Sequence, residues 1–180
     1  MTVRKTTITV ASAAALALAL PAIKQSEGYW PTVKTDWVGT GHPATGGYGE
    51  TENVKLGETH TEKYWSDRLQ QRVVAEYDVE IGKCIHVWVP DSVRAAMDST
   101  AYNTGPTALC RSSIVAKLNA GDFRGACNAL AGWYIRASGR VVQGLINRRA
   151  HDRKLCLSGV TQRAPVTPEV TPPKKAWWQK

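Results

Sequence analysis

Two carboxylates and a threonine stand close together near the start of this sequence, within a glycine-rich stretch. Glu27 is followed nine positions later by Asp36, and then by a segment that bears Thr45 and ends at Thr51. A carboxyl pair can cleave a glycosidic bond, because one acid protonates the leaving oxygen while the other carboxylate directs water or attacks the sugar. Glycines permit the turn that would bring the pair together. The stretch predicts a glycosidase site, and a solvated turn is the alternative.

The order of these residues resembles the phage-type lysozymes of glycoside hydrolase family 24. In that family a Glu, an Asp nine residues later and a Thr shortly afterwards lie in a small hairpin lobe. Glu27, Asp36 and Thr45 match this pattern, and Gly28 and Gly49 support it. The family usually has its Thr where this chain has His42. Thr45 fits if the hairpin is slightly longer here, and Thr40 is the alternative.

The resemblance implies a role for each of these side chains. Glu27 would protonate the oxygen that links N-acetylmuramic acid to N-acetylglucosamine. Asp36 and Thr45 would hold the attacking water on the opposite face of the sugar, with inversion of configuration. This hydrolysis needs no cofactor. The four histidines lie far apart in the sequence without metal-ligand spacing, so we expect no metal site.

Two later segments also match the family. Tyr102-Asn103-Thr104-Gly105 is similar to its aromatic-Asn-x-Gly segment beneath the cleft, which implies that Asn103 binds substrate. Gly144-Leu145-x-x-Arg148-Arg149 resembles its closing helix, and the family has a basic partner for the catalytic acid. Arg148, or else Arg149, is therefore expected near Glu27. The alternatives are a helix-capping role for Asn103 and an ordinary surface charge for either arginine.

The elements that must position these residues follow from apolar spacing and capping signals. Thr59-His60-Thr61-Glu62 predicts a helix with Thr59 as its N-cap. Apolar residues then recur every four positions, which predicts one buried stripe; they are Trp65, Leu69, Val73 and Tyr77. The charged residues between them are expected to form a solvated face; they are Asp67, Arg68, Arg72, Glu76 and Asp78.

More helices are expected towards the C-terminus. One begins at Pro90–Ser92 and ends at Gly105, with its buried face predicted at Val93, Ala96, Met97 and Ala101. A short helix follows from Ser112 to Leu118, another is capped by Asp122, and the closing helix begins near Val141. With the resemblance, this order implies an α+β, lysozyme-like fold, with a small N-terminal β-hairpin lobe (27–58) and a larger, mostly helical lobe (59–158).

Length and charge limit the classes of partner. A chain of 180 residues is long enough for one domain. Its net charge is +8. Such a charge suits nucleic acid, anionic lipid or an anionic wall polymer. No nucleic-acid motif is present, so we expect no nucleic-acid partner. Peptidoglycan, whose peptides carry carboxylates, fits a basic protein equally well. We expect a monomer that acts on a peptidoglycan glycan strand.

The N-terminus predicts export. Arg4 and Lys5 precede an uncharged run, Thr6–Ile23. Its eighteen residues are at the short end of the about 17–25 that span a bilayer. Three alternatives are open for this run. It could be a signal peptide cleaved after Ala19 or Ala22, a permanent membrane anchor, or a releasable signal anchor as in some phage lysozymes. The resemblance favours release, because the family's Glu follows directly from an N-terminal helix. We expect residues 1–26 to hold the protein at the periplasmic face of the host inner membrane before release into the periplasm.

Four cysteines in an exported chain favour two disulfides, with three connectivities open. The resemblance of GACNAL and RKLCL to paired elements of the family's helical lobe implies Cys127–Cys156, which leaves Cys84–Cys110. Residues 159–180 are rich in Pro and Lys, which is typical of a flexible tail.

The resemblance implies an endolysin muramidase that cleaves the β-1,4 bond between N-acetylmuramic acid and N-acetylglucosamine for host cell lysis. A lytic transglycosylase, which also needs a Glu acid, is one alternative. The other, from a different class, is a membrane-tethered wall-binding protein in which Glu27 and Asp36 are ordinary polar residues.

Overall fold

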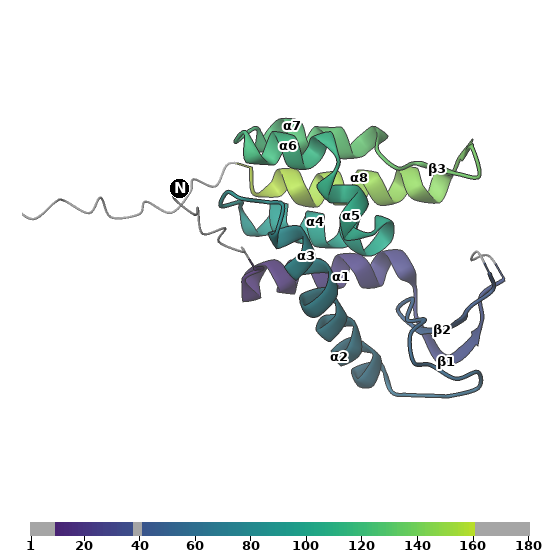
Figure 1. Ribbon diagram of the computed structural model, residues 1–180. Coiled ribbons are helices and arrows are strands. Elements are labelled where there is room, and N and C mark those ends of the chain that lie inside the picture. The colour runs from purple at the N-terminus through teal and green to yellow at the C-terminus, as the bar shows by residue number, and fades with distance from the viewer. Residues whose placement is uncertain (1–9, 38–40, 161–180) are drawn as a thin grey trace, which may run out of the picture.

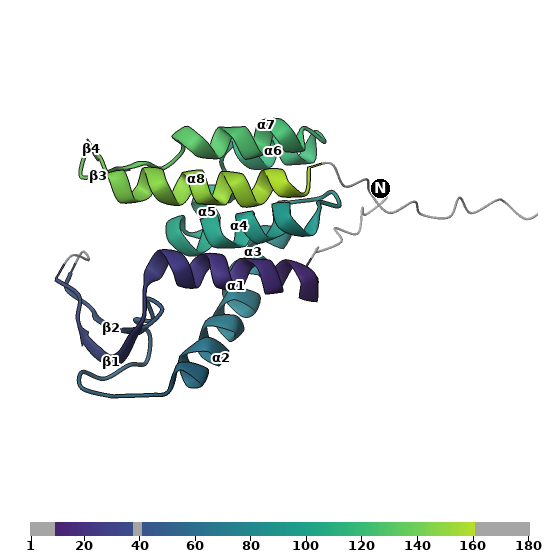
Figure 2. The same ribbon diagram turned by 180° about the vertical axis from the view of Figure 1, so that it is seen from behind.

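The computed structural model describes residues 10–37 and 41–160. It is a mostly helical body that carries two small antiparallel hairpins at one end (Figures 1 and 2). The elements are, in chain order, α1 (Ala13–Glu27), β1 (Trp30–Thr35), β2 (Ala44–Gly47), α2 (Glu62–Arg72), a π-helical turn (Val73–Asp78), α3 (Val79–Gly82), α4 (Asp91–Thr104), α5 (Pro106–Cys110), α6 (Ser113–Asn119), α7 (Phe123–Ala129), a 3-10 turn (Leu130–Gly132), β3 (Arg136–Ala137), β4 (Arg140–Val141) and α8 (Gln143–Ser158). The predicted mixture of helices and a small β lobe is confirmed.

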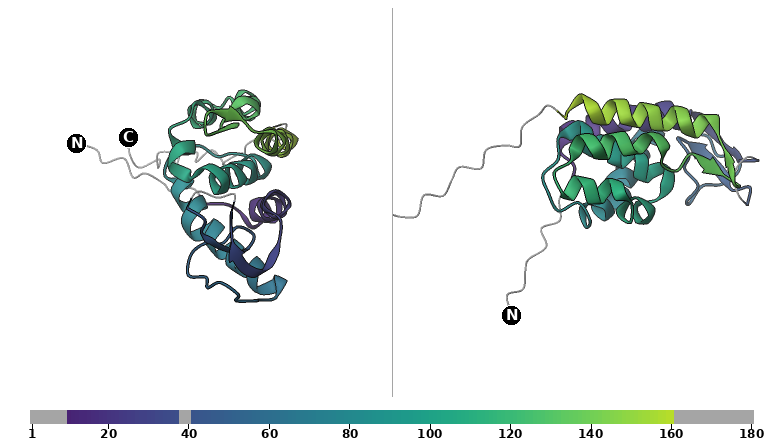
Figure 3. Two further views of the ribbon diagram at one scale, coloured as in Figure 1. Left: turned by 90° about the vertical axis from the view of Figure 1, so that its right-hand side faces the viewer. Right: turned by 90° about the horizontal axis from the view of Figure 1, so that it is seen from above.

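Helix α4 lies at the centre of the helical lobe, between α1 and α8 (Figures 2 and 3). Every residue from Ser92 to Ala101 is buried, because neighbouring helices cover α4 on several sides. The four residues predicted to face inward, Val93, Ala96, Met97 and Ala101, are all fully buried. The helix begins after Pro90 and ends at Gly105, as the sequence predicts. Helix α4 therefore forms the support on which the first and last helices are placed.

Helix α1 packs against α4 through small side chains. Ala15, Ala19, Ala22 and Ile23 are buried at spacings of three and four, which places them on one helical face. Ser12 caps the helix by accepting from Ala15 N at 3.0 Å, and its hydroxyl donates to Asp91 Oδ1 at 2.6 Å. The C-terminal part of the uncharged run is thus an integral helix of the folded lobe. In the described part of the chain, no helix is both long and apolar enough to cross a membrane.

The hairpin lobe has its own small core, which α2 completes. Strands β1 and β2 pair antiparallel, with Lys34 opposite Thr45. Trp65 of α2 is buried against the hairpin, and a Cβ on Gly46 or Gly47 would come within 2.9 Å of its ring. The indole Nε1 of Trp65 donates to Pro31 O at 3.1 Å. Of the predicted stripe, Trp65, Leu69 and Val73 lie in this small core with Val33 and Tyr48. Tyr77 packs instead against the main core of the helical lobe.

The expected start of α2 is wrong. The N-cap is Thr61, whose hydroxyl accepts from Tyr64 N at 3.3 Å, and not Thr59. Thr59 forms a bridge with Thr32 of β1, with 2.8 Å between their hydroxyl oxygens, so it belongs to the hairpin lobe. The helix starts later because the strand contact holds the backbone at Thr59.

The charged residues of this region do not all face solvent. Glu50, which follows β2, is almost fully buried, and its two oxygens accept from Arg68 Nε and Arg72 Nη1, each at 2.8 Å. Asp78 is buried and accepts from Arg94 Nε at 2.6 Å. Asp67 is exposed, as expected. The prediction fails for Asp78 and Arg72 because partners distant in sequence cover them.

Both implied disulfides are present. Cys84 is bonded to Cys110, and Cys127 to Cys156. The second bond ties α7 to α8 with both residues fully buried in the main core, whereas Cys84 and Cys110 pack at its margin. The two bonds close loops of similar length, with sequence separations of 26 and 29.

Removal of the buried disulfide is expected to destabilise the protein. We expect Cys127→Ala with Cys156→Ala to lower the free energy of unfolding by about 2–4 kcal/mol, because the closed loop no longer restricts the unfolded chain. Urea denaturation in non-reducing buffer measures this. Cys84→Ala with Cys110→Ala is the matched control and should cost less, since no fully buried sulfur is lost. A buried-pair variant as stable as the parent would contradict the prediction.

Asp98 is a fully buried carboxyl at the centre of α4. Its Oδ1 is 4.0 Å from Arg94 Nε, which makes a much closer bond to Asp78. Burial, together with the neighbouring charge of Asp78, raises the pKa of Asp98 well above its usual value. The folded protein therefore favours the protonated form of this side chain.

Asp98 should make stability depend on pH. Because its pKa is higher in the folded state, the folded protein binds more protons above about pH 4, and the contribution of Asp98 to stability falls as pH rises from there. Asp98→Asn removes this proton uptake, so stability should fall less with rising pH than in the parent. Urea denaturation at a series of pH values measures both curves. Parallel curves would show that Asp98 does not titrate in this way.

Candidate active site

Glu27 is the last residue of α1, at the junction of the two lobes. Gly28 follows with φ of 74°, a backbone conformation that favours glycine, and turns the chain into β1. The Glu27 side chain is 22% exposed, and its Oε1 lies 2.5 Å from Arg148 Nη1. The Glu27 carboxyl is thus largely buried, has a charged partner and keeps some access to solvent.

Arg148 is the basic partner that the sequence left undecided. It extends from α8, its side chain is only 8% exposed, and its Nη2 donates to Ser99 O of α4 at 3.3 Å. Arg149 is fully buried and forms an ion pair with Asp152 at 3.2 Å. Burial lowers the pKa of Arg149. Arg148 therefore faces Glu27, and Arg149 holds α8 in place.

Asn103 does not line the pocket that contains Glu27. Its Oδ1 accepts from Arg149 Nη2 at 2.8 Å, which ties the end of α4 to α8. This bond was not among the roles expected from the sequence, and the contact of Asn103 with sugar stays a prediction. The partner that Asn103 does have lies 46 positions away in the sequence.

The three proposed catalytic residues line one pocket. Its volume is about 390 Å³, and its walls include Glu27, Asp36, Thr45 and Gly49. The hairpin register places Thr45 beside the strand that leads to Asp36, and Asp36 N donates to Pro43 O at 2.9 Å. Thr40, the alternative third residue, lies outside the described residues. The structure thus brings Glu27, Asp36 and Thr45 together.

Two exposed tryptophans line the same pocket. Trp30 is 44% exposed and Trp37 is 76% exposed. The ammonium of Lys34 lies over the Trp30 ring, and His42 packs on Trp37 with 5.2 Å between ring centroids. Exposed aromatic faces beside a polar pocket suit the apolar faces of sugar rings.

The wall behind Glu27 was not foreseen from the sequence. Gly49 has φ of 85°, and a Cβ there would lie 3.2 Å from Glu27 Oε2. Close by, the hydroxyl of Tyr102 donates to Tyr48 O at 2.7 Å, and burial, together with the charge of Glu27, raises the pKa of Tyr102. The sequence signals for this wall were the match of Gly49 to the family pattern and the place of Tyr102 in the aromatic-Asn-x-Gly segment, and neither predicted a contact with Glu27. The absence of a side chain at Gly49 leaves room for the Glu27 carboxyl.

Within 10–37 and 41–160, no group of three or more His, Cys, Asp or Glu side chains is arranged to hold a metal ion. The polar side-chain groups that line the Glu27 pocket are two carboxyls, two hydroxyls, an ammonium and the N–H groups of two indoles.

Comparison with known proteins identifies relatives of this arrangement. The family model for phage lysozyme matches residues 24–152. The chain is 34% identical to the SAR-endolysin of Enterobacteria phage P21 over 113 residues, 62% of this chain and 67% of that protein. It is also 34% identical to the endolysin of Bacillus phage B103 over 146 residues, 80% of this chain but only 51% of that protein.

Solved structures show the same fold. The active form of the P1 phage endolysin Lyz superposes with a TM-score of 0.69 at 25% identity, over 86% of this chain and 88% of that chain. The endolysin from Escherichia coli O157:H7 phage FAHEc1 gives a TM-score of 0.69 at 26% identity, over 87% and 98%. The predicted lysozyme-like fold is confirmed.

Gly49→Ala should reduce activity beyond its effect on folding. A Cβ at this position would strain the backbone and push on the Glu27 carboxylate. Gly57→Ala is the matched control, since φ is 82° there but nothing lies within 4 Å of the added Cβ. Each should lose about 1 kcal/mol of stability. Only Gly49→Ala should also lose peptidoglycan-clearing activity per folded molecule, and equal activities would contradict the contact.

Proposed function

The chain belongs to the phage lysozyme family, and we propose on that premise that it is a lytic endolysin acting on peptidoglycan. In the finer form of the proposal, it hydrolyses the β-1,4 bond between N-acetylmuramic acid and N-acetylglucosamine. The observation that carries this is a single pocket lined by Glu27, Asp36 and Thr45, with Arg148 bonded to Glu27. The named relatives, which are endolysins, support it.

Glu27 acts as the general acid. It donates a proton to the oxygen that leaves, a step that requires hydrogen-bond reach between the two atoms. Proton transfer leaves a carboxylate, and the Arg148 guanidinium beside it stabilises that new charge. Gly49 leaves room for the carboxyl on the hairpin side, and the bond to Arg148 fixes its position.

Asp36 and Thr45 line the same pocket from the hairpin lobe. They position the water that attacks the sugar from the face opposite the leaving oxygen, which inverts the configuration at the anomeric carbon. The exposed rings of Trp30 and Trp37 support the sugar chain along the same wall. All of these groups belong to the polypeptide, and the proposed step needs no cofactor.

The N-terminal segment serves export and release. The uncharged run Thr6–Ile23 overlaps most of α1, whose last residue is Glu27. Cleavage after Ala22 would remove the part of α1 that packs on α4 and leave Glu27 near a chain end. We therefore propose that the run is kept intact, first at the periplasmic face of the host inner membrane and then as α1 of the periplasmic enzyme. The relatives named SAR-endolysins support this.

The same proposal divides the chain into three parts. Residues 1–26 are the releasable segment, 27–158 the catalytic domain and 159–180 a tail. Because α1 packs within the helical lobe, the first part joins the second when the enzyme is released.

Glu27→Gln tests the proposal directly. It should lower the rate of peptidoglycan cleavage by at least about 100-fold, since loss of a general acid typically costs 10²–10⁴-fold. Binding to the wall should stay nearly unchanged, because the amide has almost the same shape. Glu80→Gln, an exposed position far along the chain, is the matched control and should cleave normally. Reducing ends released from purified Gram-negative peptidoglycan measure cleavage, and co-sedimentation measures binding.

The outcomes separate the alternatives. Cleavage by Glu27→Gln at the parental rate would show that the acid lies elsewhere. Anhydro-muramic products in place of reducing ends would indicate a lytic transglycosylase. Wall binding by folded parent and variant, without cleavage by either, would favour the non-catalytic wall-binding protein.

A further inference from the structure

The packing face of α1 does little to fix the register of this helix, meaning its position along its own axis relative to α4. The residues buried there are Ala15, Ala19, Ala22 and Ile23. A shift by four residues, about 6 Å along the axis, would bring other apolar residues to the same places; they are Ala11, Ala15, Leu18 and Ala19. Small, repeated side chains specify one register only weakly. The same shift would carry Glu27 away from Arg148.

A polar contact at the start of α1 is specific to one register. Ser12 has the only polar side chain in residues 10–23. Its hydroxyl donates to Asp91 Oδ1 at 2.6 Å while it accepts from Ala15 N at 3.0 Å. Asp91 is the first residue of α4, so the hydroxyl joins the starts of the two helices. In coiled coils, too, a single polar contact fixes the register of helices whose apolar faces repeat.

A second carboxylate holds the residue before Ser12. Ala11 N donates to Asp78 Oδ2 at 2.8 Å, and Asp78 is itself buried and bonded to Arg94. Helix α1 has no acidic residue in its own first turn. Asp78 and Asp91 therefore supply the negative charge that favours the positive end of its dipole. A one-turn shift of α1 would break both contacts.

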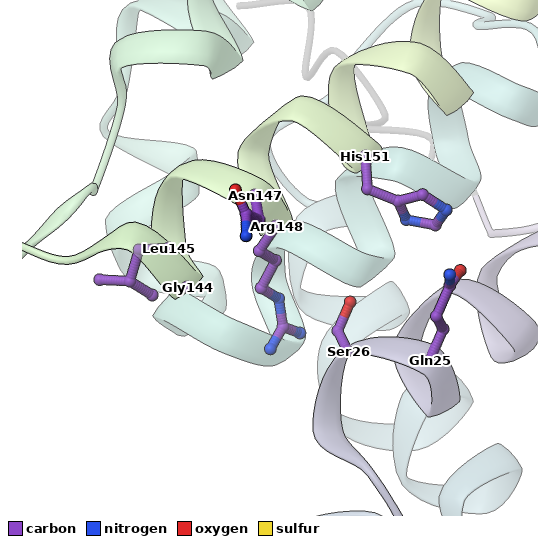
Figure 4. A pocket seen from close by; sticks show the side chains of 7 residues that line it. All are labelled: Gln25, Ser26, Gly144, Leu145, Asn147, Arg148 and His151. Carbon is purple, nitrogen blue, oxygen red and sulfur yellow. The ribbon is translucent and has the colours of Figure 1, made fainter.

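The other end of α1 meets α8. Figure 4 shows Gln25 and Ser26 in the last turn of α1, beside the part of α8 from which Arg148 extends. The guanidinium of Arg148 bonds both Glu27 and Ser99 O. Since Asp91 and Ser99 both belong to α4, this one helix holds the start of α1 directly and its end through Arg148.

We propose that Ser12 and Asp91 are positioning residues, which fix the register of α1 so that the Glu27 carboxyl stands in its pocket. The inference rests on the proposed function, because it supposes that Glu27 is the general acid. Neither Ser12 nor Asp91 lines the Glu27 pocket, so both act through the length of α1. The acid must lie within hydrogen-bond reach of the leaving oxygen. A misplacement of about 1 Å can lower a rate by about 100-fold.

Ser12→Asp separates the contact with Asp91 from the capping of α1. Ser12 is exposed, so a slightly larger side chain has room there. A carboxylate at this position still caps the helix by accepting from Ala15 N. It cannot donate to Asp91, and it repels that carboxylate. Adding Asp91→Asn to Ser12→Asp restores the contact with donor and acceptor exchanged, because an amide N–H donates to a carboxylate.

Two further variants serve as controls. Asp91→Asn alone keeps an oxygen that accepts from the Ser12 hydroxyl. Asp122→Ala is matched to Ser12→Ala, because Asp122 caps α7 by accepting from Gly125 N at 2.8 Å, and α7 lines no part of the Glu27 pocket. Both alanine variants should be less stable to urea.

All variants are compared as purified full-length protein, so that effects on export do not enter. The measurements are kcat and KM per folded molecule on soluble glycan strands. We expect Ser12→Asp to lower kcat by about tenfold, because the acid is misplaced. KM should change little, since the sugar contacts of the hairpin lobe remain. Ser12→Ala should also lower kcat, whereas Asp91→Asn and Asp122→Ala should keep the parental value. The double variant Ser12→Asp with Asp91→Asn should regain most of the lost kcat.

A parental kcat for folded Ser12→Asp would overturn the positioning role and leave the muramidase proposal standing. So would a loss of kcat that the double variant does not regain, because the effect would then not pass through the contact with Asp91. An equal loss of kcat in Asp122→Ala would also overturn it, since lower stability alone would explain the result. Failure of the folded parent to cleave the strands would overturn the proposed function itself.

Discussion

The ion pair between Glu27 and Arg148 is the interaction on which the structure of this site depends. It joins the last residue of α1 to α8 across 121 positions of sequence. Both side chains are largely buried, and a charge left there without its partner would be strongly destabilising. The pair forms only when α1 and α8 are both packed on α4, whose Ser99 O also accepts from Arg148. Folding of the helical lobe and assembly of the site are therefore the same event.

The hairpin lobe meets this pair from the other side through close backbone contacts. Trp65 packs on Gly46 and Gly47, where no side chain would fit, and Gly49 lies directly against the Glu27 carboxylate. Glu50, the next residue, is buried between two arginines of α2. The hairpin is thus held at a defined position relative to Glu27 by one aromatic contact and one buried carboxylate. Since Asp36 and Thr45 are carried on this hairpin, those contacts also set the width of the pocket.

Local signals in the sequence predicted much of the helical lobe. The bounds and the buried face of α4 follow from Pro90, Gly105 and the spacing of its apolar residues, and Asp122 caps α7 by accepting from Gly125 N. The resemblance to phage lysozymes supplied the two disulfides and the three residues that share the Glu27 pocket. At α2 the capping signal predicted the wrong N-cap, because Thr59 pairs with a strand and the helix is capped by Thr61 instead.

By itself, the sequence determined the features that depend on near neighbours along the chain, namely apolar periodicity, turn glycines, and the order of Glu27, Asp36 and Thr45. Only the tertiary structure decided that Arg148 faces Glu27 while Arg149 is buried against Asn103 and Asp152. The tertiary structure also decided that the side chains of Glu50, Arg72 and Asp78 are shielded from solvent by their ion-pair partners. The physical reason is that a charged side chain is buried only where a partner meets it, and these partners come from elements far apart in the sequence.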